Sequence, residues 1–431
     1  MKTVAFYTLG CKVNQYETEA IAERFSDSGY EIVQFGEKAD VYIINTCSVT
    51  AMSDRKSRKI IRHAKKTNPD AVVAVMGCYS QTAPDEVLDI EGVNLVLGTK
   101  DKGSVLNLIN TVDKDSKLNA VTDIKNNHEY ENLCVRKMND RTRAYIKIQD
   151  GCSQFCSYCI IPYARGPIRS RSESDILAEV KTLADAGYKE VILTGIHAAS
   201  YGKDLGDTSL EVLLNKIDNI DGIARVRLSS IEPMTLNREF VDKIKGCKKL
   251  CPHFHISLQS GCDATLKRMN RHYTTAQFKE VVEGLREVFD DCAITTDIMT
   301  GFAGETDEEF EETVKFVKDI AFSDAHVFQY SKRRGTPAAK RPNQVTPEIK
   351  ERRSKTIIDI TNKTRNEFLN KHINREMEVL FETSPSDGIY EGKTANYITV
   401  HATADENVCG KFKKVLLEKS ENGIMFGKTI D

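Results

Sequence analysis

The sequence has no long apolar run and almost no net charge, and both absences narrow the possible classes of protein. None of its 431 residues belongs to a run of about 20 apolar residues, the length that spans a bilayer. The N-terminal segment lacks the long apolar core and the small-residue cleavage site of a secretion signal. We therefore expect a cytoplasmic protein without a membrane anchor. A net charge of −2 favours no polyanionic partner by itself, so a nucleic-acid hypothesis depends on local basic patches.

Cysteine is present but too sparse to form a disulfide scaffold. Twelve cysteines in a chain of this length are typical of a reducing compartment, where such residues more often bind metal or catalyse. The length exceeds that of one ordinary hydrophobic core and predicts two or three domains.

Three cysteines in the run GCSQFCSYCIIPYARG have the spacing CxxxCxxC: Cys152, Cys156 and Cys159. Cysteine thiolates are the usual ligands of iron–sulfur clusters, and a 4Fe–4S cluster has four irons to ligate. Three cysteines leave one iron open to a substrate or cofactor, whereas a structural zinc site needs four side chains. The spacing of this CxxxCxxC triplet therefore indicates a reactive iron–sulfur site.

Residues 1–112 alternate between strand-like and helical patterns, which predicts a doubly wound parallel sheet. Cys11, Cys47 and Cys78 each follow a predicted strand. Ligands of such sheets bind beyond the carboxyl ends of the strands, so we expect this N-terminal triplet to converge there. Chance placement is the alternative, because a free cysteine is a common core residue.

A second run of alternating strands and helices follows a polar segment. Residues 113–137 lack periodicity and are predicted to be a linker, and residues 138–370 are predicted to form a full or partial TIM-type β/α barrel. The CxxxCxxC loop follows the first barrel strand, at the end where active sites form. Each polar residue at the other strand ends is, taken singly, more often a cap or a turn residue. Together they are expected to line one mouth: Thr194, Gly195, His197, Ser229, Ser230, Glu232, Ser257, Gln259 and Gly301.

Residues 371–431 alternate in strand fashion between glycine and asparagine turns, which predicts a small five-stranded antiparallel barrel of the OB type. Such barrels bind nucleic acid through aromatic and basic side chains, but a solvated strand face explains the pattern equally well. A helix predicted after Cys47 contains seven basic residues and a single acid, Asp54. Together with the basic loop 331–342, these patches indicate RNA as a substrate.

Four motifs carry a resemblance to a known family. GCSQFCSYCIIPYARG resembles the radical S-adenosylmethionine (SAM) motif, and TLGCKVNQYETE, INTCSVT and GCYSQ resemble the three cysteine blocks of the methylthiotransferases. The resemblance covers essentially the whole chain and implies a methylthiotransferase domain, a radical SAM barrel and a C-terminal TRAM domain. GCKVNQYE and GCYSQ are most similar to the branch that modifies N6-threonylcarbamoyladenosine in tRNA.

The resemblance implies SAM and two 4Fe–4S clusters as cofactors. The CxxxCxxC triplet would hold the cluster that binds SAM and generates a carbon radical, and the N-terminal triplet would hold a cluster that carries sulfur. The implied reaction installs a methylthio group on carbon 2 of N6-threonylcarbamoyladenosine at position 37 of tRNA. The implied partners are the anticodon stem-loop and a reducing electron donor such as a flavodoxin.

The resemblance also assigns residues to the SAM site. Tyr158 matches an aromatic position that packs near the adenine of SAM, and Ser230 and Gln259 match elements that face it. Thr194 and Gly195 occupy the place of the superfamily's GGE element, which contacts the methionine amino group, but they differ from it in sequence. The stretch DIMTGFAGET departs from the family's DIIVGFPGET, with an alanine where proline would restrict φ.

Two alternatives remain open from the sequence. A methylthiotransferase of another branch would act on isopentenyladenosine in tRNA or on a ribosomal protein. A non-enzymatic RNA-binding protein would hold zinc in place of the clusters, although neither triplet has an evident fourth protein ligand. The other cysteines show no pairing by spacing and are predicted to be bystanders: Cys134, Cys247, Cys251, Cys262, Cys292 and Cys409.

Overall fold

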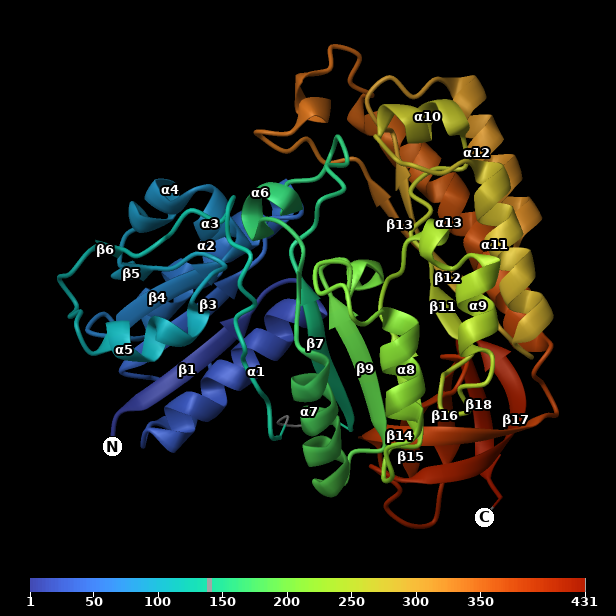
Figure 1. Ribbon diagram of the computed structural model, residues 1–431, viewed down its shortest axis with the longest axis horizontal. Helices are drawn as coiled ribbons and strands as arrows, with labels where there is room; N and C mark the ends of the chain where they lie inside the picture. The colour runs from blue at the N-terminus through green and yellow to red at the C-terminus, as the bar shows by residue number, and fades with distance from the viewer. Residues whose placement is uncertain (138–141, 431) are drawn as a thin grey trace.

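The computed structural model describes residues 1–137 and 142–430, and Figure 1 shows their arrangement in three bodies. The first body is a six-stranded parallel sheet in the order β2-β1-β3-β4-β5-β6. Its central strands are mostly apolar and are buried on both faces, as is typical of a parallel sheet that helices cover on both sides. The strands are β1 Thr3–Thr8, β2 Glu31–Val33, β3 Val41–Thr46, β4 Val72–Gly77, β5 Leu95–Val96 and β6 Leu118–Asn119.

The helices of this body follow its strands in sequence. They are α1 Lys12–Asp27, α2 Ala51–Thr67, α3 Cys78–Thr82, α4 Pro84–Leu88 and α5 Val105–Ile109. The segment predicted to be a linker contributes β6, which pairs in parallel with β5. Further along the same segment, Leu133 and Val135 are buried in the hydrophobic core of the second body. Two-residue strands such as β6 are too short to produce a recognisable alternation in the sequence.

The second body is a partial β/α barrel, in agreement with the predicted fold class. Its parallel strands form two sheets, β10-β9-β7-β8 and β11-β12-β13, which single parallel bridges such as Val226 with Leu250 connect. Strand β8 is an antiparallel edge strand beside β7. The strands are β7 Arg143–Asp150, β8 Arg169–Ser170, β9 Glu190–Gly195, β10 Arg225–Leu228, β11 His253–His255, β12 Ala293–Thr300 and β13 Asp324–Gln329.

Amphipathic helices cover the outside of this barrel. Two of them, α11 and α12, begin with complete capping boxes at Thr274 and Thr306, which satisfy the first free N–H groups of each helix. The helices are α6 Ile161–Arg165, α7 Glu173–Asp185, α8 Leu210–Asp218, α9 Arg238–Ile244, α10 Asp263–Arg268, α11 Thr275–Val288, α12 Asp307–Ile320 and α13 Pro347–Asn370.

The third body is a closed five-stranded barrel in the order β14-β15-β16-β18-β17. All its pairings are antiparallel except that of β16 with β18. Figure 1 shows it in red at the amino ends of the central strands, opposite α6. Its strands are β14 Glu376–Ser386, β15 Ile389–Thr394, β16 Thr399–Thr403, β17 Phe412–Glu421 and β18 Ile424–Thr429. Among residues 1–137 and 142–430, no helix is both long enough and apolar enough to cross a membrane.

Candidate functional site

The CxxxCxxC loop leaves the central barrel directly after β7. Gly151 turns the chain with a φ of 76°, and a Cβ there would lie 1.8 Å from a neighbouring carbonyl oxygen, so this position requires glycine. The backbone N–H of Cys152 donates to the carbonyl oxygen of Gly166 at 3.0 Å, and that of Ser157 donates to Met269 at 2.9 Å. These bonds hold the loop at the carboxyl ends of the barrel strands.

The three thiols of this loop lie close enough to influence one another. Burial, with a further contribution from Cys156, raises the pKa of Cys152 to about 11 and the pKa of Cys159 to about 12. The Nη1 atom of Arg271 donates a hydrogen bond to Cys156 Sγ at 3.3 Å. The same guanidinium lies 3.4 Å from a carboxylate oxygen of Glu232. The loop therefore presents three thiols beside one partly compensated positive charge.

The N-terminal triplet lies at the carboxyl ends of three adjacent strands. Cys11 is the N-cap of α1 after β1, Cys47 follows β3, and Cys78 opens α3 directly after β4. Burial raises the pKa of the Cys47 thiol to about 11, and Cys78 and Cys11 contribute to this shift. Gly10 has a φ of 103°, and a Cβ there would lie 2.7 Å from the Cβ of Cys47. The sheet order thus brings together three cysteines that are far apart in the sequence.

A buried group of charges, which we call the ionic cluster, joins the two cysteine-bearing bodies. It consists of Glu17 from α1, Lys102, Lys147 and Asp150 from β7, and Arg165 from α6, and each of these side chains is at most 5% exposed. Glu17 pairs with Lys102, and its Oε1 atom lies 2.7 Å from Lys147 Nζ and 2.6 Å from Arg165 Nη1. Lys147 and Arg165 also contact Asp150, at 2.7 and 3.2 Å. With Arg169, which lies 3.5 Å from Asp150, four cations therefore share two carboxylates directly behind the N-terminal triplet.

A cavity of about 200 Å³, the mouth cavity, lies between the loops that carry the two triplets. Cys159 lines it from the CxxxCxxC loop, and Val49 lines it two residues after Cys47. Gln259 has a φ of 68°, a conformation that a residue other than glycine adopts at an energetic cost and that is concentrated at functional sites. Further side chains of the lining are Thr50, Tyr158, Asp297, Met299, Phe328 and Tyr330.

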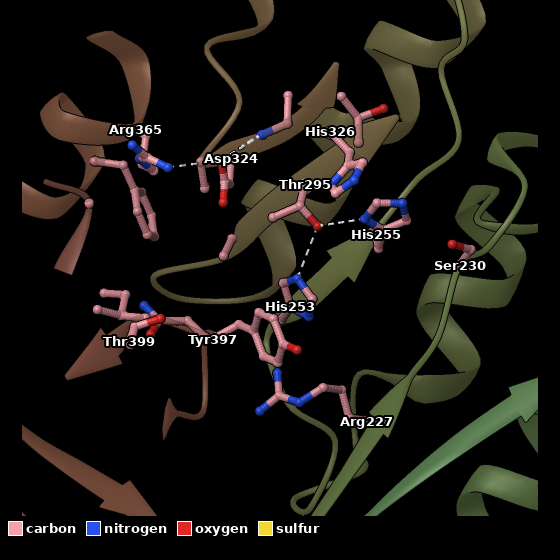
Figure 2. A pocket seen from close by; sticks show the side chains of 18 of the residues that line it. Arg227, Ser230, His253, His255, Thr295, Asp324, His326, Arg365, Tyr397 and Thr399 are labelled. Atoms are coloured by element: carbon pink, nitrogen blue, oxygen red, sulfur yellow. Dashed lines mark hydrogen bonds and ion pairs between the residues drawn. The ribbon is translucent and has the colours of Figure 1, made fainter. Parts of the chain in front are cut away.

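The residues predicted to contact SAM are divided between different places. Tyr158 and Gln259 line the mouth cavity. Thr194 and Gly195 end β9, where Thr194 is 2% exposed and Gly195 packs against Gln149. Ser230 lines a second cavity of about 310 Å³, the base cavity, which lies between the barrel strands, α13 and the C-terminal barrel (Figure 2). The structure therefore brings two of these residues to the mouth cavity.

Glu232, which was expected at the mouth from the sequence, accepts a hydrogen bond from Gln154 of the CxxxCxxC loop at 2.8 Å, while His197 lies 3.2 Å away.

Other residues of the site gave no recognisable signal in the sequence. Arg271 follows α10 in a loop and belongs to no motif, yet it contacts Cys156. The members of the ionic cluster are likewise scattered along the chain. Spacing could not identify these residues, because tertiary contacts alone bring them together.

The thiols of the two triplets are not gathered around one position for a single metal ion in the described residues. Within residues 1–137 and 142–430, no three side chains of His, Cys, Asp or Glu converge closely enough to hold one metal ion. Each cysteine of a cluster binds a different iron, so its thiols are spread more widely than the ligands of a single ion. A cluster that leaves one iron open needs three thiols and no fourth protein ligand.

Comparisons with known proteins agree with this chemistry. Residues 146–317 match the model of the Radical SAM superfamily, and residues 3–98 match the model described as "Uncharacterized protein family UPF0004". Among solved structures, a radical SAM methyltransferase, TsrM, from Kitasatospora setae superposes with a TM-score of 0.57 at 16% identity, over 78% of this chain and 77% of the other. This likeness concerns the fold alone.

Curated relatives match nearly the full length of the chain. The threonylcarbamoyladenosine tRNA methylthiotransferase MtaB of Bacillus subtilis is 43% identical, over 97% of this chain and 94% of its own. The protein of the same name from Thermotoga maritima is 38% identical over 99% and 96%. A tRNA-2-methylthio-N(6)-dimethylallyladenosine synthase of Acetivibrio thermocellus is 34% identical over 100% and 91%. The chain therefore belongs to the methylthiotransferase family of radical SAM enzymes.

Proposed function

We propose that this protein is a tRNA methylthiotransferase that installs a methylthio group on carbon 2 of N6-threonylcarbamoyladenosine. The observation that carries the proposal is the mouth cavity, whose walls come from both cysteine-bearing loops. The relatives with the higher identities are named for threonylcarbamoyladenosine, which favours this base over dimethylallyladenosine.

The reaction explains the need for two cysteine triplets. A C–H bond of an aromatic base has no useful acidity, so general-base catalysis, worth roughly 10²- to 10⁴-fold, does not open it. When bound, SAM and the two 4Fe–4S clusters supply the radical, the methyl group and the sulfur that this substitution requires. We assign the cluster that binds SAM to the CxxxCxxC triplet. We assign the cluster that carries sulfur to the N-terminal triplet.

The residues of the chain position the reactants and exclude water. Tyr158 and Met299 give the mouth cavity apolar walls, against which we expect the adenine of SAM to pack. Burial raises the pKa of Tyr158 well above its usual value, so this ring remains neutral. Arg271 places a positive charge against Cys156 and is itself held by Glu232. The target base must leave its stack to reach this cavity, at a cost of a few kcal/mol.

Contacts to the tRNA backbone are expected along α2. This helix starts at the mouth cavity, where Thr50 lines the cavity and the backbone N–H of Ala51 donates to Ser331 Oγ at 3.2 Å. Lysine and arginine side chains point into solvent along the helix and are free to bind phosphates. The exposed ones are Arg55, Lys56, Lys59, Arg62 and Lys66.

Some aromatic and basic side chains of the C-terminal barrel face the central barrel instead of solvent. Tyr397 stacks on His253 of the central barrel, with ring centroids 4.5 Å apart. Lys393 lies 4.9 Å from the ring of Tyr397 and faces the same interface. These two side chains are therefore directed toward the central barrel, whereas Lys411 and Lys414 are exposed.

The proposal is tested by anaerobic reconstitution with iron, sulfide, SAM and a reductant such as flavodoxin. Anticodon stem-loops that carry threonylcarbamoyladenosine or dimethylallyladenosine are supplied separately, and the nucleosides are analysed by mass spectrometry. We expect the methylthio product from the first stem-loop and its loss in both Cys11→Ala and Cys156→Ala. Product from the dimethylallyl stem-loop alone would instead assign the chain to the other branch.

A further inference from the structure

The base cavity has the character of a specific ligand site. Its volume of about 310 Å³ falls at the lower end of the range for small-molecule pockets, which is about 300–1,000 Å³. Figure 2 shows polar side chains from the barrel strands, α13 and the C-terminal barrel directed into it. The lining includes Lys12, Arg227, Ser230, His253, His255 and Tyr397. Lys12 directly follows Cys11 of the N-terminal triplet in the sequence, so its backbone adjoins that cysteine.

Positive charge exceeds negative charge around this cavity. Glu190 contacts Arg143, Arg225 and Arg227 at 3.7, 4.0 and 3.0 Å. Arg143 and Arg225 also pair with Glu382 and Glu378, each at 3.0 Å, and Asp324 in the lining pairs with Arg365, so the excess positive charge comes from Lys12 and Lys393. The guanidinium groups of Arg143 and Arg227 lie 5.6 and 4.7 Å from the centre of the Tyr397 ring. Burial alone would raise the pKa of Tyr397, but the charges of Arg143 and Lys12 outweigh this effect and lower it. A bound anion would be stabilised in this environment.

Lys12 has no counter-ion of its own in the described parts of the chain. Its ammonium group forms no ion pair with any described carboxylate and lies 5.9 Å from the centre of the Tyr145 ring. Lys12 is half-buried, and an ammonium group that is partly withdrawn from water and lacks a carboxylate partner is unfavourable. A ligand carboxylate would supply the missing charge.

A chain of hydrogen bonds connects the base cavity to the mouth cavity. The hydroxyl of Thr295 lies 3.0 Å from both His253 Nε2 and His255 Nδ1, as Figure 2 shows. The Nε2 atom of His255 lies 3.2 Å from Asp297, whose side chain lines the mouth cavity. When His255 donates to Asp297, its Nδ1 accepts from the hydroxyl, which in turn accepts from His253. These four residues therefore form a wall between the two cavities. The direction of each hydrogen bond in this wall is set by the bond from His255 to Asp297.

This order leaves the Nδ1 atom of His253 as a hydrogen-bond acceptor. The side chain is buried, at 6% exposure, and no described residue donates to that atom. Burial lowers the pKa of His253 well below its usual value, so the ring remains neutral. A buried acceptor of this kind fits a ligand that also carries a hydroxyl donor.

We propose that the base cavity receives the threonylcarbamoyl group of the target base, with Lys12 as the counter-ion of its carboxylate. The inference rests on the proposed function. Carbon 2 and the N6 substituent flank N1 on one edge of the purine, so a base that presents carbon 2 to the N-terminal triplet directs its substituent toward the neighbouring residues. The threonyl group carries one carboxylate and one hydroxyl, which match Lys12 and the free acceptor of His253.

The same features disfavour the binding of dimethylallyladenosine. A dimethylallyl group has neither charge nor hydrogen-bonding atoms, so its insertion would leave Lys12 and His253 without partners. A site that is built to bind polar groups discriminates strongly against an analogue that lacks them. Lys12 is thus assigned as a specificity residue for the threonylcarbamoyl substrate.

The test compares three stem-loops with the reconstituted full-length enzyme: the threonylcarbamoyl acid, its methyl ester, and the dimethylallyl base. The variants are Lys12→Met, the rescue variant Lys12→Arg, and the matched control Lys279→Met, which changes a lysine that is 53% exposed on α11. Equilibrium binding is measured by fluorescence anisotropy, and KM and kcat are measured by mass spectrometry. Iron content and the melting temperature verify that each variant is folded and loaded.

We expect wild-type enzyme to bind the acid about tenfold or more tightly than the ester, as befits a charge-assisted contact. Lys12→Met should bind acid and ester equally, mainly through a higher KM for the acid, while Lys12→Arg and Lys279→Met keep the preference. An unchanged ratio of acid to ester in Lys12→Met would overturn the inference. Failure of the proposed function is distinguishable, because wild-type enzyme would then methylthiolate none of the threonylcarbamoyl stem-loop whatever the binding ratio.

Discussion

Gly10 shows how one residue without a side chain permits the N-terminal triplet to form. It combines a φ of 103°, which residues with a Cβ rarely adopt, with a close approach to Cys47. Gly29 allows the effect of backbone strain to be measured without the effect of the contact. It has a φ of 84°, but a Cβ added there would meet nothing within 4 Å.

We predict that Gly10→Ala displaces Cys47 and prevents loading at the N-terminal triplet. The added Cβ would lie 2.7 Å from the Cβ of Cys47, so one of the two chain segments must move. The iron content after anaerobic reconstitution should fall by about half relative to wild type. Gly29→Ala is the control, and it should cost only about 1–2 kcal/mol of stability while iron content is retained. Full iron loading of Gly10→Ala would contradict this account.

At the scale of elements, α13 is joined to the C-terminal barrel through His372. This side chain is 1% exposed, and its Nδ1 atom lies 2.9 Å from the carbonyl oxygen of Phe368. Its other nitrogen lies 3.3 Å from Asn396 Nδ2 and 3.8 Å from Asp291, which in turn pairs with Arg375 at 2.5 Å. The junction therefore buries an imidazole beside one carboxylate.

The junction should lose stability in mild acid. Burial lowers the pKa of His372 below its usual 6.5, despite the opposing influence of Phe368 and Asp291. The unfolded chain therefore binds a proton more readily than the folded chain, and the free energy of unfolding decreases as pH falls below about 6.5. Urea unfolding followed by circular dichroism at about pH 7.5 and 5.5 measures this change.

His372→Gln provides the comparison for the pH effect. Glutamine keeps hydrogen-bonding capacity but does not titrate, so the loss of stability between the two pH values should be smaller than in wild type. The carboxyl group of Asp291, whose pKa Arg375 lowers, contributes only at more acidic pH and is common to both proteins. Equal pH dependence in the two proteins would exclude His372 as the source.

At the scale of the whole molecule, the ionic cluster fixes the two cysteine-bearing bodies to each other. Glu17 comes from the N-terminal body, whereas Lys147, Asp150 and Arg165 come from the central barrel. A buried group of charges is weak evidence for stability in itself, but removal of one partner leaves the others uncompensated. The relative position of the two triplets depends on this contact.

We predict that Glu17→Gln destabilises the protein by about 3–5 kcal/mol, because Lys102 would lose its carboxylate partner and Lys147 and Arg165 would keep only Asp150. The free energy of unfolding in urea at neutral pH measures the loss. Glu239→Gln is the matched control, since Glu239 is 77% exposed in a surface pair with Lys243 and should change stability by less than about 1 kcal/mol. A similar small effect for both substitutions would show that the ionic cluster does not stabilise the assembly.

The sequence predicted the fold class correctly because its signals are local. Period-two alternation predicted the small C-terminal barrel, and alternating strands and helices predicted the sheet and the central barrel. The two-residue strand β6 escaped prediction, because it is too short to form a pattern and depends on its neighbour β5. The segment around Leu133 was likewise expected to be a linker, yet it packs into the core of the barrel.

By itself, the sequence indicated the kind of chemistry. The spacing of the CxxxCxxC triplet predicts an iron–sulfur site with one open iron, and the resemblance of the motifs around Cys11, Cys47 and Cys78 implies a second cluster, without reference to any distant contact. The tertiary structure alone decided which residues surround that chemistry, because Arg271, the ionic cluster and the base cavity assemble from segments far apart in the chain. Contacts of this kind depend on packing between elements, and no local period or spacing encodes them.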